Sequence, residues 1–404
     1  MEYLHPSSVP SSKSELSLFK VPPTQVAIDS TYDVEYRPSA SLESATVHEI
    51  NIPASEDFTD LSQTMLHLGI EVLTDDNVKV SDDKVKCVEN FANSIFDQID
   101  FFLGTVNTSQ ANNMYHYTSY IEDLLFRHPT KADISRYDKS VYIKSNIELY
   151  FRLHLPMLTQ DKLLINGIPL MFRFTRSPRS FPIIAETGSF KIKLTKLAIH
   201  MKRVKLFPDA QTGIISALNN SNANYFIIRN EVKSFSLSKG LSSATMENIF
   251  AGILPRRLII GFVEESGYSG DIKMDPYKFE NLKIKQISLS VDGNTIPSIP
   301  YQPDFPDNCM REYVNLFRVL GQDEGIPQID LSYDDYKSKK TLFAFDIGGA
   351  LGGESGSLSL LKRGAIRLEI RFTSETTKQY KIIVFAQFDN LISIDKDRNV
   401  YLDY

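Results

Sequence analysis

One arrangement of residues occurs twice in the chain, roughly half a chain length apart. Each copy has a strand-like segment that begins with Gln-Ile, then a polar turn, then an amphipathic helix pattern that contains tyrosine. The first copy covers residues 98–105 and 115–126, and the second covers 286–293 and 311–320. Such self-similarity predicts two similar β-rich halves in one chain. Chance is the alternative, because strand, turn and helix often follow one another.

Length and composition limit the classes of protein that remain. A chain of 404 residues suits two domains of about 200 residues better than one core. Its 42% hydrophobic and 23% charged residues are ordinary for a folded protein. A net charge of -6 argues against a protein that coats nucleic acid. Only Cys87 and Cys309 are present, too few for a disulfide framework, which favours a reducing compartment.

Targeting and membrane segments are not expected. Residues 1–20 lack a basic stretch followed by an apolar one, so the sequence predicts no signal peptide. No apolar run approaches the roughly 18 residues that a transmembrane helix needs. We therefore expect no transmembrane segment.

Alternation with a period of two dominates the chain. In residues 366–372, and again in 190–202, apolar side chains alternate with charged ones, which is typical of a half-buried strand. Further strand candidates lie at 25–28, 33–37, 45–52, 65–73, 147–155, 225–237, 257–263, 341–346 and 380–388. Asn166-Gly167 and Asp292-Gly293 predict type I′ hairpin turns. Many strands, few short helices and no βαβ rhythm predict an all-β fold of paired antiparallel sandwiches.

Two places in the chain look like boundaries. The Ser/Pro-rich start, residues 1–23, lacks periodicity and predicts an N-terminal arm that is mobile or bound to a neighbour. Residues 208–224 include an Asn/Ser-rich stretch and are the best candidate for the boundary between halves, although a long loop within one domain is the alternative. We therefore predict a first β-sandwich over 24–207 and a second over 208–404.

The chain carries no recognisable catalytic motif. Its seven histidines form no HExxH pair and no His-x-His of the kind that a metal-binding barrel uses. No Gly-x-Ser-x-Gly elbow presents a serine. The glycine-rich loop at 348–356 follows a strand but lacks the Gly-Lys-Ser/Thr ending of a phosphate loop, so we interpret it as a flexible loop. We expect no enzyme: no catalytic, cofactor-binding or metal-binding residues, and no cofactor.

One acidic constellation is a weak calcium candidate. Asp395, Asp397 and Asn399 have the alternating oxygen ligands that open a calcium loop. The sixth position is Val400 rather than the glycine that the turn requires, and no closing glutamate follows. A turn whose carboxylates bond nearby backbone amides is favoured, and calcium shared with a neighbouring subunit stays open.

Two other clusters have a functional and a structural interpretation. A basic run follows one predicted strand, at Lys191, Lys193, Lys196, Lys202, Arg203 and Lys205. It lacks aromatic platforms, which favours a solvated or salt-bridged sheet face over a nucleic-acid stripe. On the helix pattern at 115–126, Tyr115, Tyr117 and Tyr120 would form a stacking surface for a sugar or a base if exposed. Tyr117 and Tyr120 share a face with Ile121 and Leu124, which favours core packing.

At this point the residues resemble a known family. Residues 18–25 (Leu-Phe-Lys-Val-Pro-Pro-Thr-Gln), 36–38 and 115–125 are similar to the first half of the Maverick/Polinton (adintovirus) hexon-type double jelly-roll major capsid protein. The second half is more similar, with matching segments in order at 254–263, 291–293, 303–305, 342–346, 367–372 and 388–400. The last of these, Phe-Asp-Asn-Leu-Ile-Ser-Ile-Asp-Lys-Asp-Arg-Asn-Val, is the most specific. Together the segments span nearly the whole chain.

The resemblance implies a double jelly roll, with two eight-stranded antiparallel sandwiches and short helices in the loops. Three chains would place six similar rolls around a threefold axis, giving a pseudo-hexagonal capsomer that tiles an icosahedral shell. It further implies a homotrimer with neighbouring capsomers and a penton protein as partners, no sequence-specific nucleic acid binding, and a place in a virion capsid made inside the host cell, in the cytoplasm or the nucleus. The glycine-rich loop and the segment 388–400 are then candidate subunit contacts.

The sequence departs from the family pattern in two places, and other classes of protein stay open. The segment 128–140 is shorter than the insertion that the family has there, and 267–277 match its pattern loosely, which affects the expected shape of the outer tower.

A β-sandwich receptor- or glycan-binding module is the main alternative, and it predicts an exposed aromatic and carboxylate cluster. A hydrolase on a β-sandwich is disfavoured by the missing motifs. A capsid gene retained by a host genome, and no longer making particles, is a variant of the structural class.

Overall fold

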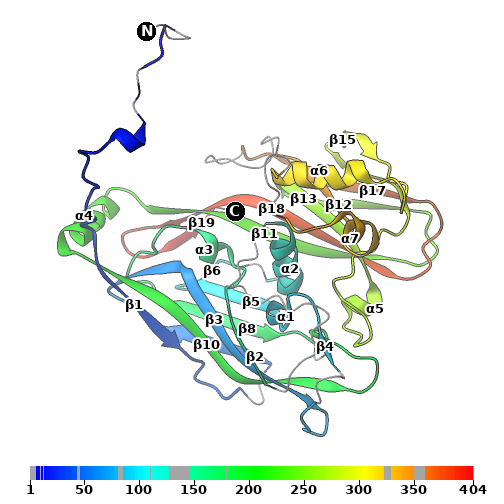
Figure 1. Cartoon of the computed structure of the whole chain (residues 1–404), viewed down its shortest axis with the longest axis horizontal. Coiled ribbons are helices and arrows are strands. Elements are labelled where there is room, and N and C mark those ends of the chain that lie inside the picture. The colour runs from blue at the N-terminus through cyan, green and yellow to red at the C-terminus, as the bar shows by residue number, and fades with distance from the viewer. Residues whose placement is uncertain are drawn as a thin grey trace.

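The computed structural model describes residues 6–9, 11, 13–42, 46–80, 85–109, 111–126, 146–178, 180–322, 329–348 and 360–403. Its strands form two sandwiches that lie side by side, with short helices between and beside them (Figure 1). Residues 128–140 and most of the glycine-rich loop lie outside the described residues, so the expectations about them stay predictions.

The first roll is built from two four-stranded antiparallel sheets. One sheet has the order β1-β10-β3-β7 and the other β2-β8-β5-β6. Lettered B to I along the chain, these strands read B-I-D-G and C-H-E-F, which is the order of a jelly roll. Their bounds are β1 Ile28–Tyr36, β2 Val47–Ile52, β3 Phe58–Thr74, β5 Phe96–Leu103, β6 Val106–Asn107, β7 Asn146–Phe151, β8 Leu170–Arg176 and β10 Phe190–Leu206.

The second roll repeats this order. One sheet reads β11-β18-β13-β16, with β19 paired to β18, and the other reads β12-β17-β14-β15. The predicted double jelly roll is therefore confirmed. The bounds are β11 Ala223–Leu237, β12 Ser243–Ile253, β13 Arg257–Glu264, β14 Ile284–Val291, β15 Asn294–Tyr301, β16 Leu342–Asp346, β17 Arg363–Phe372, β18 Tyr380–Ile394 and β19 Val400–Leu402. A small sheet pairs β4 (Lys86–Cys87) with β9 (Ile183–Ile184).

Two helices occupy the same place in the two rolls. Helix α2 (Tyr115–Leu125) lies between the fifth and sixth strands of the first roll, and α6 (Met310–Leu320) lies between the same strands of the second. The repeated sequence pattern is thus the fourth strand, β5 in the first roll and β14 in the second, followed after the fifth strand by this helix. The other helices are η1 Ser14–Leu16, α1 Phe91–Ser94, α3 Pro156–Thr159, α4 Pro208–Leu218, α5 Glu265–Tyr268 and α7 Tyr333–Ser338. Among the described residues, no helix is long and apolar enough to cross a membrane.

One of the two predicted hairpin turns is confirmed and one is wrong. Asp292 and Gly293 both have positive φ and join β14 to β15 through the pair Val291↔Asn294. At the other site only Gly167 has positive φ, and it lies in the connection between α3 and β8 rather than in a hairpin. The turn there is held instead by Arg398, whose guanidinium donates to the Asn166 carbonyl at 2.7 Å and to its Oδ1 at 2.8 Å.

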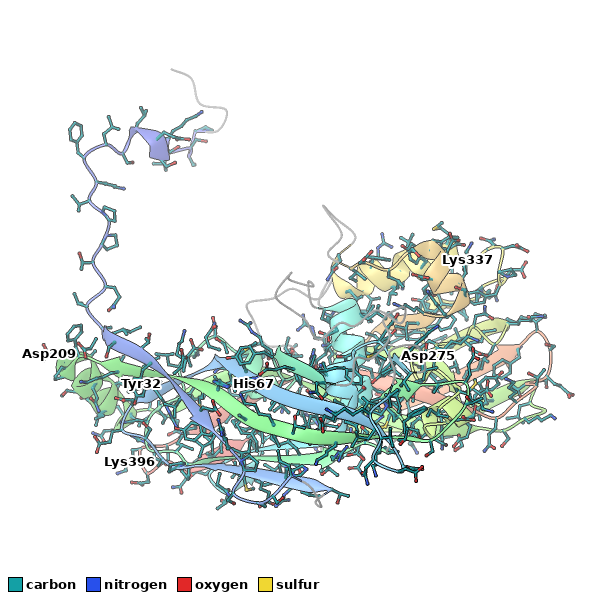
Figure 2. The ribbon with its side chains drawn as sticks, turned by 60° about the horizontal axis from the view of Figure 1, so that its bottom comes forward. Tyr32, His67, Asp209, Asp275, Lys337 and Lys396 are labelled. Atoms are coloured by element: carbon teal, nitrogen blue, oxygen red, sulfur yellow. The ribbon has the colours of Figure 1, made fainter. Side chains whose placement is uncertain are left out.

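The segment around residue 208 is more ordered than a loop. Pro208 begins α4, where the fixed φ of proline suits the first helical position. The apolar cores of the two halves also exchange residues, because Tyr117 and Ile121 pack into the core of the second roll while Tyr225 and Ile392 pack into that of the first. The described residues before β1 extend away from the body of the molecule (Figure 2). The boundaries at 23/24 and 207/208 stay predictions.

Candidate functional site

Helix α2 lies at the junction of the two rolls and is buried on nearly every side (Figure 1). Tyr117 is 0% exposed, Tyr120 3% and Ile121 1%. A helix surrounded in this way belongs to a core rather than to a surface. The predicted core packing of these tyrosines is confirmed, but the core they enter belongs largely to the other roll.

The aromatic part of this junction joins α2 to the connection between β13 and β14. The rings of Tyr120 and Tyr277 stack with centroids 4.2 Å apart and planes 4° from parallel. The Tyr117 hydroxyl donates to the Pro276 carbonyl at 2.9 Å, and the Tyr277 hydroxyl donates to the His116 carbonyl at 3.2 Å. Burial raises the pKa of all three tyrosines well above its usual value, so the phenols remain neutral donors.

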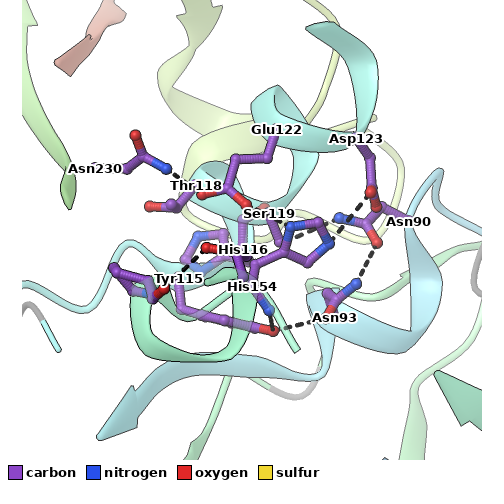
Figure 3. A network of polar contacts seen from close by, with 12 residues as sticks. Asn90, Asn93, Tyr115, His116, Thr118, Ser119, Glu122, Asp123, His154 and Asn230 are labelled. Atoms are coloured by element: carbon purple, nitrogen blue, oxygen red, sulfur yellow. Dashed lines mark hydrogen bonds and ion pairs between the residues drawn. The ribbon is translucent and has the colours of Figure 1, made fainter. Parts of the chain in front are cut away.

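A buried polar network lies beside the aromatic contact (Figure 3). His154, which follows β7, places Nδ1 2.6 Å from Glu122 Oε2 and Nε2 3.2 Å from Asp123 Oδ1. The imidazole is 1% exposed, and the two carboxylates are 11% and 9% exposed. Because ionised carboxylates only accept hydrogen bonds, a doubly protonated imidazolium satisfies both contacts at once. This arrangement holds α2 against the strand end that carries His154.

The same network reaches the second roll. The side-chain amide of Asn230, on β11, donates to Glu122 Oε1. Gln387, on the neighbouring β18, donates from Nε2 to Asn230 Oδ1 at 2.9 Å. Glu122 therefore accepts from both rolls, one contact through His154 and one through Asn230. Buried ionic groups of this kind contribute little net stability but penalise any arrangement that breaks them, so the network can specify how one roll sits on the other.

A second polar contact joins the rolls at the far end of β11. The Tyr225 hydroxyl donates to the Leu163 carbonyl at 3.1 Å and accepts from the Ile165 backbone N–H at 3.0 Å. Lys162 Nζ donates to the Asn224 carbonyl at 2.9 Å. Together with α2, these bonds join the two rolls at two separated points.

The acidic turn near the C-terminal end of the sequence is satisfied without a metal ion. Asp395 Oδ1 accepts from the backbone N–H groups of Asp397 and Asn399, each at 2.9 Å. Its Oδ2 accepts from Asn399 Nδ2 at 2.9 Å and from the Tyr401 hydroxyl at 3.0 Å. The Asn399 side-chain bond is the main cause that lowers the pKa of Asp395. The described part of the chain holds no group of three or more His, Cys, Asp or Glu residues that could hold a metal ion.

The basic run lies on β10 and is mixed with acidic neighbours. Lys205 Nζ lies 3.7 Å from Asp29 Oδ2 on β1, and Lys191 Nζ donates to the Asp75 carbonyl at 3.0 Å. Arg203 is only 3% exposed and donates to the Tyr36 hydroxyl at 3.0 Å. These contacts agree with a partly salt-bridged sheet face.

Two segments were expected to make subunit contacts, the glycine-rich loop and residues 388–400, and the structure describes mainly the second. Of the glycine-rich loop, only Gly348 is among the described residues. In the segment 388–400, Phe388, Ile392 and Ile394 are at most 4% exposed and lie in the chain's own cores. Removing that segment would unfold β18 rather than test a contact between subunits.

Exposed apolar side chains also gather elsewhere, and two such places are the N-terminal arm and the region where α6 follows β15. The first is the N-terminal arm, where Leu16, Leu18, Phe19 and Val21 are 69–97% exposed. The second is the start of α6 together with β15. A soluble chain rarely leaves such groups uncovered without a partner, so both are candidate contact surfaces.

Comparisons with known proteins bear on this fold. No family model matches the sequence. An uncharacterised protein of Caenorhabditis elegans is 24% identical over 263 residues, which cover 62% of this chain and 62% of that protein. The match thus spans less than two thirds of the length of this curated relative.

Solved structures are similar over nearly the full length. PBCV-1 VP54, fitted into a cryo-EM reconstruction of the virophage Sputnik, has a TM-score of 0.66 at 10% identity, covering 96% of this chain and 99% of that one. The major capsid protein of mavirus has a TM-score of 0.59 at 10% identity, covering 100% of this chain and 97% of that one. At such identities the likeness shows the fold, and this chain has the double jelly-roll fold of these viral proteins.

Proposed function

We propose that this chain is a structural major capsid protein that trimerises into pseudo-hexagonal capsomers. The observation that carries the proposal is the presence of two complete jelly rolls with the same strand order in one chain. Three copies would then place six equivalent rolls in a closed ring, which fills a hexagonal site in a shell. An icosahedral shell built from such tiles needs many weak contacts rather than a few strong ones.

The junction between the rolls, with contacts at two points, supports this role. A tile keeps its outline only if the angle between its two rolls is fixed, and α2 with the His154 network fixes it within each chain. The exposed apolar arm supports contacts beyond the trimer. We propose the chain itself and a penton protein as partners, with no sequence-specific nucleic acid binding. The N-terminal arm (1–23), first roll (24–207) and second roll (208–404) are the proposed domains.

The proposed setting is a virus-like particle of the Maverick/Polinton (adintovirus) kind. The resemblance of residues 388–400 to that family supports it. Assembly would take place inside the host cell. A capsid gene that a host genome retains would give the same chain without particles.

Native mass spectrometry combined with negative-stain imaging of the purified chain tests the proposal. The expected result is a trimer of hexagonal outline. A chain that stays monomeric at all concentrations would contradict trimerisation and would favour the receptor- or glycan-binding alternative.

That alternative has one observation of its own. On the face of the first roll, the ring of Tyr150 lies 5.6 Å from that of His67 and 5.3 Å from that of His200, and Glu148 contacts His67. Tyr150 is 42% exposed. If this cluster bound a glycan, Tyr150→Ala would abolish binding in a glycan-array measurement without changing the oligomeric state.

A further inference from the structure

The two rolls meet head to tail within the chain. The connection between strands G and H of the first roll, residues 152–169, lies against strand B of the second roll, which is β11. Helix α3 in this connection contacts β11 (Figure 1), and Lys162 Nζ donates to the Asn224 carbonyl at 2.9 Å. The chain has one more surface of each kind: strand B of the first roll, which is β1, and the G–H connection of the second roll, residues 347–362. Of that connection, the structure describes 347–348 and 360–362.

The strand pairing places Tyr32 on β1 and Tyr225 on β11 at equivalent positions. In both rolls the last residue of strand D pairs with the first residue of strand I, and a second D–I pair lies seven residues back along D. Five residues further along I from that second pair lies the partner of the tyrosine on strand B. The pairs in this order are Thr74↔Phe190, His67↔Ala198 and Arg203↔Tyr32 in the first roll, and Glu264↔Tyr380, Arg257↔Gln387 and Ile392↔Tyr225 in the second.

The two tyrosines differ in what covers them. Tyr225 is 2% exposed, and its hydroxyl donates to the Leu163 carbonyl at 3.1 Å and accepts from the Ile165 N–H at 3.0 Å, both in the G–H connection of the other roll. Tyr32 is 45% exposed, and its hydroxyl donates to Asp57 Oδ2 at 2.7 Å. A phenol that donates one hydrogen bond can still accept another. Tyr32 can therefore receive a backbone N–H from a neighbouring loop, as Tyr225 does.

The G–H connection of the second roll carries apolar side chains in solvent. Leu360 and Leu361, which directly precede β17, are 88% and 67% exposed. In the first roll, Leu164 and Ile165 lie in the same connection and are 1% and 6% exposed. Apolar groups that one roll buries are thus left uncovered in the other, which is typical of a surface that contacts a further subunit.

Ring symmetry relates the two sets of surfaces. In a ring of six rolls, the rotation that carries a first roll onto the second also carries the second onto the first roll of the next copy. It therefore carries the contact of the first G–H connection with β11 onto a contact of the second G–H connection with β1 of the next copy. We infer that Leu360 and Leu361 of one copy pack against the exposed end of β1 around Tyr32 in the next copy. This inference rests on the proposed trimer, and three such contacts close the ring.

Substitution of Leu361 tests the inference. Leu361→Glu places a charge in the apolar contact, and we expect trimer dissociation at a concentration at least about tenfold higher than for the wild type, measured by dilution and native mass spectrometry. The matched control is Val47→Glu, because Val47 is 41% exposed and lies on β2, in the other sheet of the first roll. We expect this control to trimerise as the wild type does. Circular dichroism checks that both variants fold.

The outcomes separate this inference from the proposed trimer. A wild-type trimer that Leu361→Glu leaves intact overturns the inference while the trimer stands. Equal weakening by Val47→Glu would also overturn the assignment of the contact to Leu361. A wild-type chain that never trimerises contradicts the proposed function itself, and the inference falls with it.

A pair of opposite charges identifies the partner surface. Tyr32→Lys should weaken the trimer as Leu361→Glu does, because each single variant places a charge against an apolar group. In the double variant the introduced lysine and glutamate face each other across the contact, so it should dissociate at a lower concentration than either single variant. Weakening that simply adds in the double variant would mean that Leu361 does not meet the end of β1 at Tyr32.

Discussion

Helices α2 and α6 follow the same strand in the two rolls, yet their surroundings differ. Helix α2 is buried by both rolls, and its tyrosines stack on the second one. Helix α6 packs on its own roll and leaves Met310 and Val314 in solvent. The same helix position therefore makes a contact between the rolls in the first roll and leaves apolar side chains exposed in the second.

The buried carboxylates of the two helices, Glu122 and Glu312, also differ in their partners. Glu122 on α2 is matched by the imidazole of His154 and the amide of Asn230, which come from different rolls. Glu312 on α6 is 4% exposed, and burial raises its pKa. The backbone N–H of Glu312, the charge of Arg311 and the backbone N–H of Gln302 oppose that shift only in part. The carboxylate of the junction helix is therefore contacted directly by side chains of both rolls, whereas that of the outer helix depends on backbone N–H groups and on the nearby charge of Arg311.

The same substitution on each helix should give the largest contrast. Ile121→Glu places an unpaired charge in a site that is 1% exposed, and we expect a loss of about 5 kcal/mol or more in the free energy of unfolding. Val314→Glu changes a half-exposed side chain, and we expect a change within about 0.5 kcal/mol for the isolated chain. Urea denaturation of the monomeric fraction measures both. Equal losses would show that α6 is as buried in solution as α2.

Removal of the imidazole should have the next largest effect. His154→Ala leaves Glu122 and Asp123 buried without their shared cation, and the expected cost is about 3–5 kcal/mol. Urea denaturation at neutral pH measures this cost.

A second substitution distinguishes an ion pair from simple packing. Glu122→Gln should destabilise the wild type, because it weakens the contact with His154. In the His154→Ala background the same change removes an unpaired buried charge, so it should stabilise the protein. If the stability losses of the two single variants simply add in the double variant, the network does not act through charge.

The sequence predicted most of the fold because the strands obey local rules. Alternation located β17 and much of β10, β18 was among the further strand candidates, and the Asp-Gly pair at 292–293 marked a turn in which both residues have positive φ. The strands that it missed include β12 and β15, which are sheet edges. Edge strands have polar residues on both faces, and β15 contains Pro297 and Pro300, so their pattern is weak.

The junction could be predicted only in part. The spacing of Tyr117 and Tyr120 with Ile121 indicated a buried face, but the partner Tyr277 is far away in the sequence and belongs to the other roll. The hydrogen bonds of His154 are equally non-local. One signal was available, since Glu122 and Asp123 lie in a helix that is otherwise largely aromatic and apolar, and buried charges need partners.

Loss of one hydroxyl should have a smaller effect on the junction. Tyr120→Phe keeps the stack on Tyr277 but loses the bond to Glu89 Oε2 at 2.8 Å, for an expected cost of about 1 kcal/mol. Tyr120→Leu removes the ring as well, and the aromatic pair adds about 0.5–1.5 kcal/mol to the cost. Thermal and urea unfolding of the two variants separate these contributions. Identical costs would mean that the stacking geometry contributes nothing beyond burial.

The smallest expected effect is a pH-dependent gain in stability when Glu312 on α6 is replaced. Because burial raises the pKa of Glu312 in the folded state, ionisation costs stability as pH rises through that folded pKa, and the cost is absent below the ordinary value of 4.5. Glu312→Gln should therefore stabilise the chain near pH 7 by up to about 1 kcal/mol and have no effect near pH 4. Glu122→Gln, the substitution of the buried glutamate on α2, should instead lower the free energy of unfolding near pH 7. A gain for Glu312→Gln that persists at the lower pH would assign the effect to packing, and the electrostatic difference between the two helices would then not hold.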